Sequence, residues 1–331
     1  MRTSHKLTHA LLALAALVVL ASAAFAQLPG ISFPATSEIS DQKAGSVLIY
    51  TVYSSSAANA NAENTRINLT NTSTTSSAFV HLFFVDGNSC SVADAFVCLT
   101  PNQTTSFLTS DVDPGTMGYI VAVAVDPLTG LPRNFNHLIG DEFVKFATGH
   151  QANLGAEAVA KLTNANVVSA DGTLAIILFD AGSYNRLPRV LAADSIGSPA
   201  DGDSVLLVID RIGGNLLTGT GIIGNLFGIL FDESEHAFSF TFFSAACQVK
   251  AILSDNFPRT TPRFSAAIPA GSRGWLKIFN PNVDRGLLGA EITRNSNSAS
   301  AAGAFSGGHN LHKLTLTAEE QLVIPVFLPT C

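Results

Sequence analysis

Short apolar segments separated by turn residues run through the chain after residue 44. In Arg66-Ile67-Asn68-Leu69-Thr70 polar and apolar residues alternate, which predicts a strand with one buried face. The segment from Ala78 to Val85 is almost wholly apolar and ends at Asp86-Gly87, a turn signal. Similar features predict strands at residues 47–54, 66–70, 78–85, 104–108, 119–126, 142–147, 174–180, 205–210, 225–230, 238–243, 264–267, 275–279, 289–294 and 322–327.

A helix is predicted only at residues 153–162, where Leu154, Ala158 and Leu162 fall roughly on one helical face. Short strands with almost no helix predict an all-β protein, built as a sandwich or a barrel and not around a parallel sheet.

The position of His81 bears on which face of the strand at 78–85 is buried. Period two places it with Phe79 and Phe83, which predicts a hydrogen-bonded histidine in the core. The alternative is that Val80 and its alternate neighbours face inward instead.

The sequence repeats itself once. The segment Ala78–Cys90 resembles Ala237–Cys247, because each begins with Ala-Phe, contains Phe-Phe and ends at a cysteine. Gly118-Tyr119-Ile120 likewise resembles Gly274-Trp275-Leu276. Other pairs, in the same order, are residues 45–50 with 203–208, 138–142 with 287–291, 149–150 with 308–309, 161–163 with 313–315, and 174–179 with 322–327. Ordered matches at a similar spacing indicate an internal duplication.

The duplication gives a domain plan of two tandem β-sandwiches, each of ordinary domain length. Proline and glycine interrupt the periodicity around residue 190, which predicts a linker there. The predicted plan is a signal peptide at 1–26, an extended arm at 27–44, a first sandwich at 45–182, a linker at 183–202 and a second sandwich at 203–331.

Residues 66–87, followed by Leu-Thr-Pro-Asn-Gln-Thr-Thr-Ser-Phe at 99–107, resemble the strand pattern of bacterial adhesion-type immunoglobulin-like modules. The resemblance covers part of the first repeat and extends loosely to the second, where Asp232-Glu233 and Ala245-Ala246 replace the turn residues. It implies that the sandwiches are immunoglobulin-like and that the protein has a surface or adhesive role. It implies no site residues.

The N-terminus has the three parts of a secretory signal peptide. Arg2 and Lys6 precede an apolar run, and Ala24-Phe25-Ala26 is typical of a cleavage site after Ala26. We therefore expect a secreted, extracellular or periplasmic protein. No later segment offers about 20 uncharged apolar residues, so no membrane span is predicted in the mature chain.

Charge argues against a nucleic-acid partner. Removing residues 1–26, which contain two basic and no acidic residues, takes the net charge from −7 to −9. Phosphate binding requires clustered Lys and Arg instead. Charged residues make up only 13% of the chain, against about 25% in an average protein, so Ser, Thr and Asn must cover much of the surface.

All four cysteines lie in the exported part, where disulfides persist. Four cysteines allow three pairings. We favour Cys90 with Cys98, which would close a short loop, and Cys247 with Cys331, which would fasten the C-terminal strand. The alternative is that the thiols stay free and buried.

Histidines offer a weak candidate for a metal site. His309 and His312 are three residues apart, and His236 lies near acidic residues, but zinc needs three or four converging ligands. Because Gly-His recurs at Gly149-His150, a structural hydrogen bond shared by His150 and His309 is the favoured interpretation. No metal or other cofactor is therefore predicted.

Two kinds of loop motif resemble ligand sites. Residues 219–224 spell G-x-G-x-x-G, but a strand is expected next, whereas dinucleotide binding requires a helix. Acidic pairs at Asp111/Asp113 and Asp201/Asp203 have calcium-type ligands without the twelve-residue loop pattern, and turn chemistry explains both.

Five further residues have both a functional and a structural interpretation. Trp275 would stack on a sugar ring, but its counterpart Tyr119 favours a core aromatic. Arg259 and Arg263 would bracket an anion, although solvated loop arginines are favoured. Glu142 and Glu291 recur between the repeats on short strands, and paired carboxylates of a glycosidase are the functional alternative, because the spacing of such a pair is spatial. The sequence has no G-x-S-x-G elbow for a serine nucleophile.

These features predict a non-catalytic secreted or cell-surface protein with a structural or adhesive role. Its partners would be a cell surface, matrix or polysaccharide, or further copies of itself. A carbohydrate- or small-ligand-binding module is the alternative, and an extracellular hydrolase the third.

Overall fold

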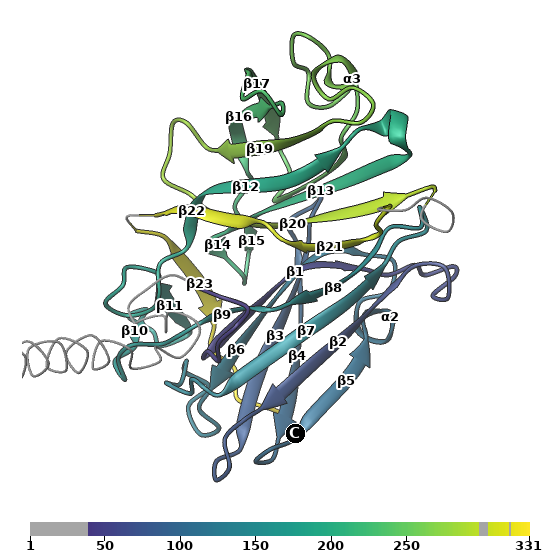
Figure 1. Ribbon diagram of the computed structural model, residues 1–331. Coiled ribbons are helices and arrows are strands. Elements are labelled where there is room, and N and C mark those ends of the chain that lie inside the picture. Colours follow the sequence, from purple (N-terminus) through teal and green to yellow (C-terminus); the bar gives the residue numbers. More distant parts are fainter. Residues whose placement is uncertain (1–38, 298–303, 318) are drawn as a thin grey trace, which may run out of the picture. The chain divides into compact units, whose positions relative to one another are not determined.

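Strands and turns account for nearly all of residues 39–297, 304–317 and 319–331, which are the residues that the computed structural model describes (Figure 1). The predicted signal peptide at 1–26 and most of the predicted arm at 27–44 lie outside them. Only the end of the arm is described, where Ile39 is buried and Ser40 bridges Ala158. Within these residues no helix has the length and apolarity needed to cross a membrane.

The described strands form five sheets. Sheet 1 contains, in order, β4 (Val92–Leu99), β3 (Ala78–Asp86), β6 (Met117–Val125), β1 (Val47–Ser54) and β9 (Glu157–Val159). Sheet 2 contains β5 (Thr104–Leu108), β2 (Asn64–Asn71), β7 (Leu138–Lys145) and β8 (Gln151–Gly155). Sheet 3 contains β17 (Ala237–Ser244), β16 (Gly224–Phe231), β19 (Arg273–Phe279), β12 (Pro188–Gly197) and β22 (His312–Leu316). Sheet 4 contains β18 (Gln248–Ile252), β13 (Asp203–Ile212), β20 (Gly286–Asn295) and β21 (Gly307–Asn310).

Sheet 5 combines strands from distant parts of the chain: β10 (Val167–Val168), β11 (Leu174–Leu178), β23 (Gln321–Pro325), β14 (Gly214–Asn215) and β15 (Gly219–Thr220). In Figure 1 the yellow strand β23 runs beside the teal strand β11, to which it pairs antiparallel. Three short helices complete the described elements: α2 (Thr109–Val112), η1 (Pro199–Asp201) and α3 (Phe264–Ala267).

The prediction of two tandem immunoglobulin-like sandwiches is wrong. The chain is all-β, but its five sheets are arranged as a five-bladed β-propeller. The order of strands also departs from the consecutive four-strand blade of ordinary propellers, because successive strands enter different sheets. Sequence patterning predicts individual strands from local periodicity, whereas the number of sheets depends on long-range pairing such as that of β11 with β23.

Sheets 1 and 3 nevertheless have the same strand order, and so do sheets 2 and 4. We call sheets 1 and 2 the first half and sheets 3 and 4 the second half. Both halves have a bulge at the same place: the pairing of β1 with β6 shifts between Tyr50 and Tyr53, and that of β12 with β19 shifts between Ala193 and Ile196. The two halves can therefore be compared position by position.

This comparison corrects the sequence matching. The counterpart of β3 is β16, and the counterpart of β4 is β17, so Ala78–Cys90 does not correspond to Ala237–Cys247. The wrong match arises because β17 carries the same Ala-Phe and Phe-Phe spacing as β3. Tyr119 and Trp275 do occupy equivalent positions. Each follows a glycine, Gly118 or Gly274, that pairs with the first residue after the bulge, Tyr53 or Ile196.

Two further predictions are wrong. The region assigned to a linker, 183–202, contains β12, a central strand of sheet 3. The predicted helix at 153–162 is instead the end of β8 and all of β9, because Leu154 and Ala158 point into sheet-lined cores. Proline and glycine in the first case mark strand ends, and the apolar spacing in the second fits strands equally well.

Both faces of sheet 1 are buried. One face packs against sheet 2, and the other packs against sheet 5, where Ile177 of β11 and Ile324 of β23 join the same apolar cluster as Val121 of β6. His81 is fully buried on β3, as predicted, and its Nε2 lies 2.8 Å from Asp94 Oδ2. Burial lowers the pKa of His81, which opposes the effect of that carboxylate.

The predicted disulfides, Cys90–Cys98 and Cys247–Cys331, are wrong. A disulfide joins Cys98 to Cys331 across a Cα–Cα distance of 6.1 Å. Cys90 and Cys98 lie at opposite ends of the extended strand β4, which separates them by roughly 25 Å, too far for a disulfide. Cys90 and Cys247 are both buried and take no part in this disulfide.

Candidate functional site

A cleft of about 320 Å³, lined by several ionisable residues, opens between sheets 3 and 4 at the bulge of β12. We call it the acidic cleft. Its lining residues are Asp194, Ser195, Asp203, Arg273, Glu291, Thr293, Phe305, Gly307, Gly308 and His309.

Glu291 is the most buried acid of this cleft. It lies on β20 opposite Leu207 on one side and His309 on the other, and only 3% of it is exposed. Burial, followed by the negative charge of Asp194, raises the pKa of Glu291 to about 8. Its Oε1 accepts a long hydrogen bond from Thr293 Oγ1 at 3.5 Å, and Oε2 has no partner among the described residues. With this pKa the carboxyl group is mostly protonated at neutral pH, and the residue lines the cleft.

Asp194 supplies the complementary carboxylate. It projects from the bulge of β12, about half exposed, and holds two histidines: His309 Nε2 lies 3.4 Å from Oδ1 and His312 Nε2 lies 3.3 Å from Oδ2. The two imidazole rings are 5.4 Å apart. The carboxylate of Asp194, which accepts hydrogen bonds, and the imidazole rings of two histidines, which can donate or accept them, thus border Glu291.

Arg273 closes the other side of the cleft. Its Nη1 donates to the carbonyl of Ser195 at 2.8 Å, and its backbone N–H donates to Glu233 Oε1 at 2.8 Å. Asp203 is held by Asn295, whose Nδ2 donates to Oδ1 at 2.6 Å. These contacts fix the backbone of the bulge and leave Glu291 as the group without a full set of partners.

In the first half, the glutamate at the equivalent position has a structural role. Glu142 on β7 occupies the position of Glu291 and is fully buried. Its Oε1 accepts hydrogen bonds from Val52 N at 3.1 Å and Thr51 Oγ1 at 3.2 Å, both in the bulge of β1. In the second half Asp194 replaces Thr51 at the bulge, and its charge cannot approach an ionised glutamate closely. Oε2 of Glu142, like Oε2 of Glu291, has no partner among the described residues. Glu291 differs in that it lacks the two bulge donors and lines the acidic cleft.

An aromatic surface adjoins the cleft on the outer face of sheet 3. Trp275 on β19 stacks on Phe231 of β16, with centroids 4.1 Å apart and planes 7° apart. Phe227 and Phe279 form a second cross-strand pair at 5.4 Å. Lys277 lies between the two pairs on the same face. We call these five residues the aromatic face.

The prediction that Trp275 is a core residue like Tyr119 is wrong. Leu276 and Ile278 point into the core between sheets 3 and 4, so Trp275 points outward and stays partly exposed. Tyr119 is only 1% exposed because sheet 5 covers that face of sheet 1. In the described residues, no apolar core cluster includes the four aromatic residues of the aromatic face.

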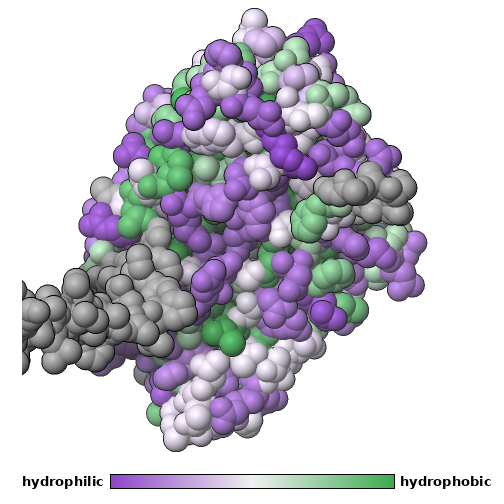
Figure 2. Space-filling model, viewed as in Figure 1, coloured by the Kyte–Doolittle hydropathy of each residue, from purple (hydrophilic) through white to green (hydrophobic). Residues whose placement is uncertain are grey.

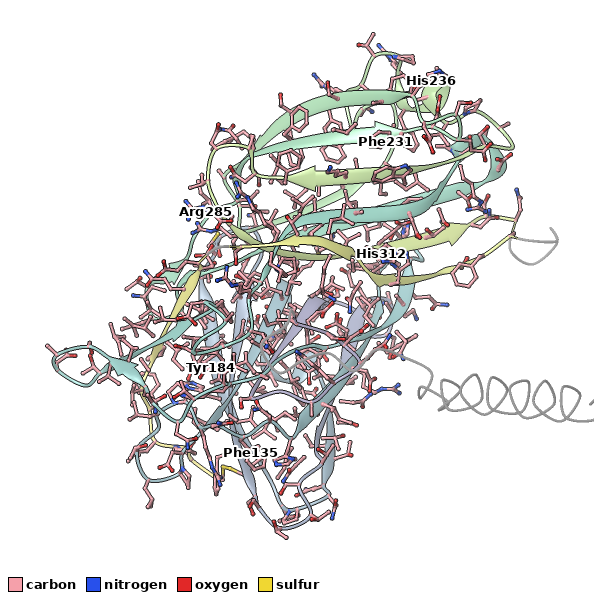
Figure 3. All side chains as sticks on the ribbon, turned by 60° about the vertical axis from the view of Figure 1, so that its left-hand side comes forward. Phe135, Tyr184, Phe231, His236, Arg285 and His312 are labelled. Carbon is pink, nitrogen blue, oxygen red and sulfur yellow. A yellow bond between two sulfur atoms is a disulfide. The ribbon has the colours of Figure 1, made fainter. Side chains whose placement is uncertain are left out.

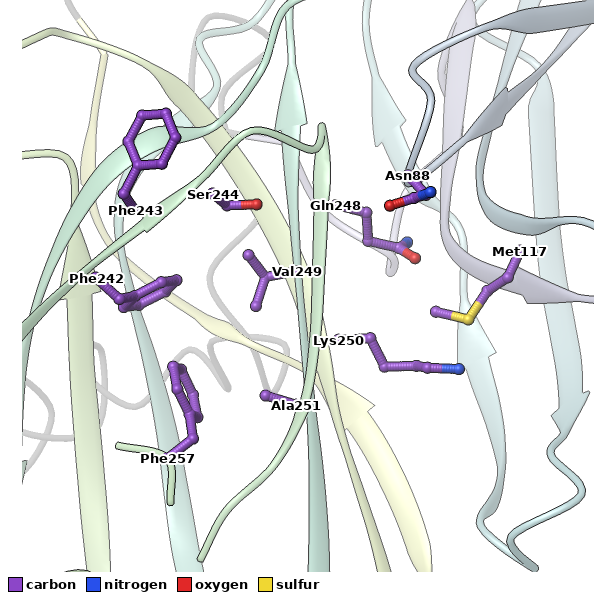
Figure 4. Close-up of a pocket in the computed structure, with 11 residues that line it drawn as sticks. Asn88, Met117, Phe242, Phe243, Ser244, Gln248, Val249, Lys250, Ala251 and Phe257 are labelled. Carbon is purple, nitrogen blue, oxygen red and sulfur yellow. The ribbon is translucent and has the colours of Figure 1, made fainter. Parts of the chain in front are cut away.

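A second cleft, of about 510 Å³, surrounds the edge strand β18. Figure 4 shows Phe242, Phe257 and Val249 on one side of this strand, and Lys250 and Met117 on the other. The remaining lining residues are Gly87, Asn88, Phe243, Ser244, Gln248 and Ala251. This edge cleft is formed by both halves, and it holds fewer ionisable groups than the acidic cleft.

The three histidines proposed as weak metal ligands do not converge. His309 and His312 meet at Asp194, but His236 pairs with Asp232 at 2.9 Å at the end of β16. Figure 3 shows His236 and His312 well apart. In the described part of the chain no group of three or more His, Cys, Asp or Glu side chains is placed to hold a metal ion.

The predicted equivalence of His150 and His309 is wrong, although each ring lies close to a backbone carbonyl, His309 Nδ1 being 2.9 Å from Asn310 O. His150 is buried, with Nε2 2.9 Å from Ser204 O, whereas His309 is 43% exposed beside Asp194. The residue opposite Glu142 in the first half is Leu154, so the two Gly-His pairs are not equivalent positions.

The other loop motifs have structural roles. Gly219 and Thr220 form β15, and Gly224 begins β16, so a strand follows the glycines as expected. Asp113 accepts from Tyr53 OH at 2.6 Å and Asp201 accepts from Gly271 N at 2.7 Å. The candidate anion ligands Arg259 and Arg263 are exposed loop residues.

Sequence reasoning missed Asp194 and Arg273. Asp194 lies within the predicted linker, and Arg273 precedes Trp275 by two residues without any motif. The recurrence of Glu142 and Glu291 was the available signal for Glu291, whereas the bulge that carries Asp194 is visible only in the strand pairing.

The surface around these groups is largely polar. Figure 2 shows hydrophilic residues over much of the visible face, with apolar residues in small separate groups between them. A ligand of this surface would therefore meet many hydrogen-bonding groups.

The cleft offers hydrogen-bond donors and acceptors, and the aromatic face offers stacking surface on β19, the strand that also carries Arg273 of the cleft. A sugar hydroxyl both donates and accepts, and the rings of Trp and Phe offer apolar surface to a partner. No family model matches this chain. No curated protein matches it in sequence either.

Proposed function

We propose that the protein is an exported, non-catalytic adhesive protein that binds a carbohydrate chain at the acidic cleft and the aromatic face. The observation that carries the proposal is the outward orientation of Trp275 beside a cleft whose buried Glu291 has an unpartnered oxygen. The buried acid supplies a donor, Asp194 supplies an acceptor, and Arg273 lies on the same strand as Trp275 at the boundary between the two surfaces.

Energetics favour an occupied site. A buried polar atom without a hydrogen bond costs about 1–3 kcal/mol, and Glu291 Oε2 is such an atom. A rotation of the side chain that turns this oxygen toward the cleft would let a ligand hydroxyl remove the cost. Partly exposed aromatic rings also lose apolar surface to water when a sugar ring covers them. Lys277 lies between the aromatic pairs, and in the described residues it makes no ion pair, so the surface also suits acidic sugars.

Screening the purified protein against neutral and uronic-acid polysaccharides tests the proposal. Affinity electrophoresis is expected to show retardation by at least one polysaccharide, and reducing-end assays are expected to show no cleavage of it. Absence of retardation by every polysaccharide would contradict carbohydrate binding. Release of reducing ends would contradict the non-catalytic role and would favour the hydrolase, for which Glu291 and Asp194 are residues of the required type.

A further inference from the structure

Two turns from different halves of the molecule meet at the buried cysteines. Cys90 lies in the turn between β3 and β4, where its N–H donates to Asp86 O at 2.9 Å. Cys247 directly precedes β18, and its N–H donates to Gly87 O at 3.1 Å. The Sγ of Cys247 lies 3.2 Å from the same Asp86 carbonyl. One backbone carbonyl therefore contacts both cysteines.

Both side chains belong to one apolar cluster. Cys90 is 6% exposed and Cys247 is fully buried, and the shared contact with Asp86 O brings the two residues close together. The disulfide between Cys98 and Cys331 uses the other two cysteines. Of the three possible pairings, only Cys90 with Cys247 is compatible with that bond.

We propose that Cys90 and Cys247 form a second disulfide, which joins the turn between β3 and β4 covalently to the start of β18. A thiolate of one cysteine attacks a small-molecule disulfide or a disulfide oxidoreductase and forms a mixed disulfide. The second cysteine then displaces the carrier sulfur. The protein loses two protons and two electrons, and the exchange partner leaves as two thiols.

Burial determines when this bond forms. Burial, followed by the neighbouring Cys90, raises the pKa of Cys247 to about 12, and exchange requires the thiolate. The folded dithiol therefore reacts slowly at neutral pH. The bond forms during oxidative folding, before the cluster closes around both sulfurs.

The bond also fixes the edge cleft. Gly87 and Asn88 reach this cleft from the first half, and Gln248 and Val249 reach it from the second (Figure 4). Because Gly87 neighbours the turn of Cys90 and Gln248 follows Cys247, a bond between the cysteines holds the two walls together.

Disulfide mapping tests the proposal. The full chain is reduced, refolded in a mixture of reduced and oxidised glutathione, quenched in acid, denatured and alkylated before digestion. We expect a linked peptide containing Cys90 and Cys247, no alkylation of either residue, and a gain of about 4 Da when the intact protein is reduced. A gain of about 2 Da with both residues alkylated would overturn the proposal, and so would a peptide linking either of them to Cys98 or Cys331.

Two matched variants separate the bonds. Cys98→Ser combined with Cys331→Ser should keep one disulfide, located at Cys90 and Cys247. Cys90→Ser combined with Cys247→Ser should keep the other. If a variant fails to fold, the peptide map of the wild-type protein decides alone, because it requires no substitution.

Discussion

At the scale of single residues, the duplicated glutamates show how one position takes two roles. Glu142 satisfies the backbone of a bulge, while Glu291 faces Asp194 and a cavity. Burial raises the pKa of both, but Glu291 lines the acidic cleft. The difference arises from one neighbour, Thr51 in the first half and Asp194 in the second.

Glu291 should make stability depend on pH. Its pKa is about 8 in the folded protein, against 4.5 for an unperturbed glutamate. The folded state therefore binds more protons between these values, and the free energy of unfolding contributed by Glu291 falls as pH rises from about 5 to about 8. Replacing Glu291→Gln should remove a slope of about 1.4 kcal/mol per pH unit at most.

Urea unfolding at pH 5.5, 7 and 8.5 measures this slope. Asp171→Asn is the matched control, because Asp171 is exposed and its pKa of about 2 lies below the range tested. Its slope should equal that of the wild type. Equal slopes for Glu291→Gln and the wild type would contradict the raised pKa.

At the scale of elements, β6 and β19 occupy the same place in sheets 1 and 3 but have different surroundings. Sheet 5 covers the first and leaves the outer face of the second partly exposed. The local sequences, Gly-Tyr-Ile and Gly-Trp-Leu, do not reveal this difference. The covering of β6 depends on sheet 5, which includes β23 from the far end of the chain.

Equivalent truncations in these strands should therefore differ in cost. Tyr119→Ala should destabilise the protein by about 3–5 kcal/mol, because it empties a buried site. Trp275→Ala should cost only about 1–2 kcal/mol, because the ring is partly exposed. Denaturant unfolding of the two variants measures both values. Equal costs would show that Trp275 is a core residue after all.

At the scale of the whole molecule, alternation and turn residues predicted an all-β protein and the positions of most strands. The arrangement of five sheets could not be predicted, because strands such as β3 and β17 have similar patterns and only their partners distinguish them. The candidate site was predicted in part: Glu291, His309 and Trp275 were identified, but Asp194 was assigned to a linker. Its bulge becomes visible only in the pairing of β12 with β19.

The shared core predicts that the first repeat does not fold alone. Leu322 and Ile324 belong to the same apolar cluster as Val121 and Phe83, although they lie near the C-terminus. A fragment of residues 45–182 should therefore show no cooperative unfolding, whereas the full chain should unfold in one transition. Calorimetry of both proteins tests this. Two separate transitions in the full chain would contradict a shared core.

Carbohydrate binding at the acidic cleft and aromatic face is tested most directly by comparing two aromatic variants. Phe243 is 62% exposed and lies at the edge cleft, so Phe243→Ala controls for loss of an exposed ring elsewhere. Affinity for the polysaccharide that binds best is measured by titration calorimetry. Trp275→Ala should weaken binding at least about tenfold, equivalent to about 1.4 kcal/mol, and Phe243→Ala should leave it unchanged. Unchanged affinity in Trp275→Ala, or an equal loss in both variants, would contradict the proposed site.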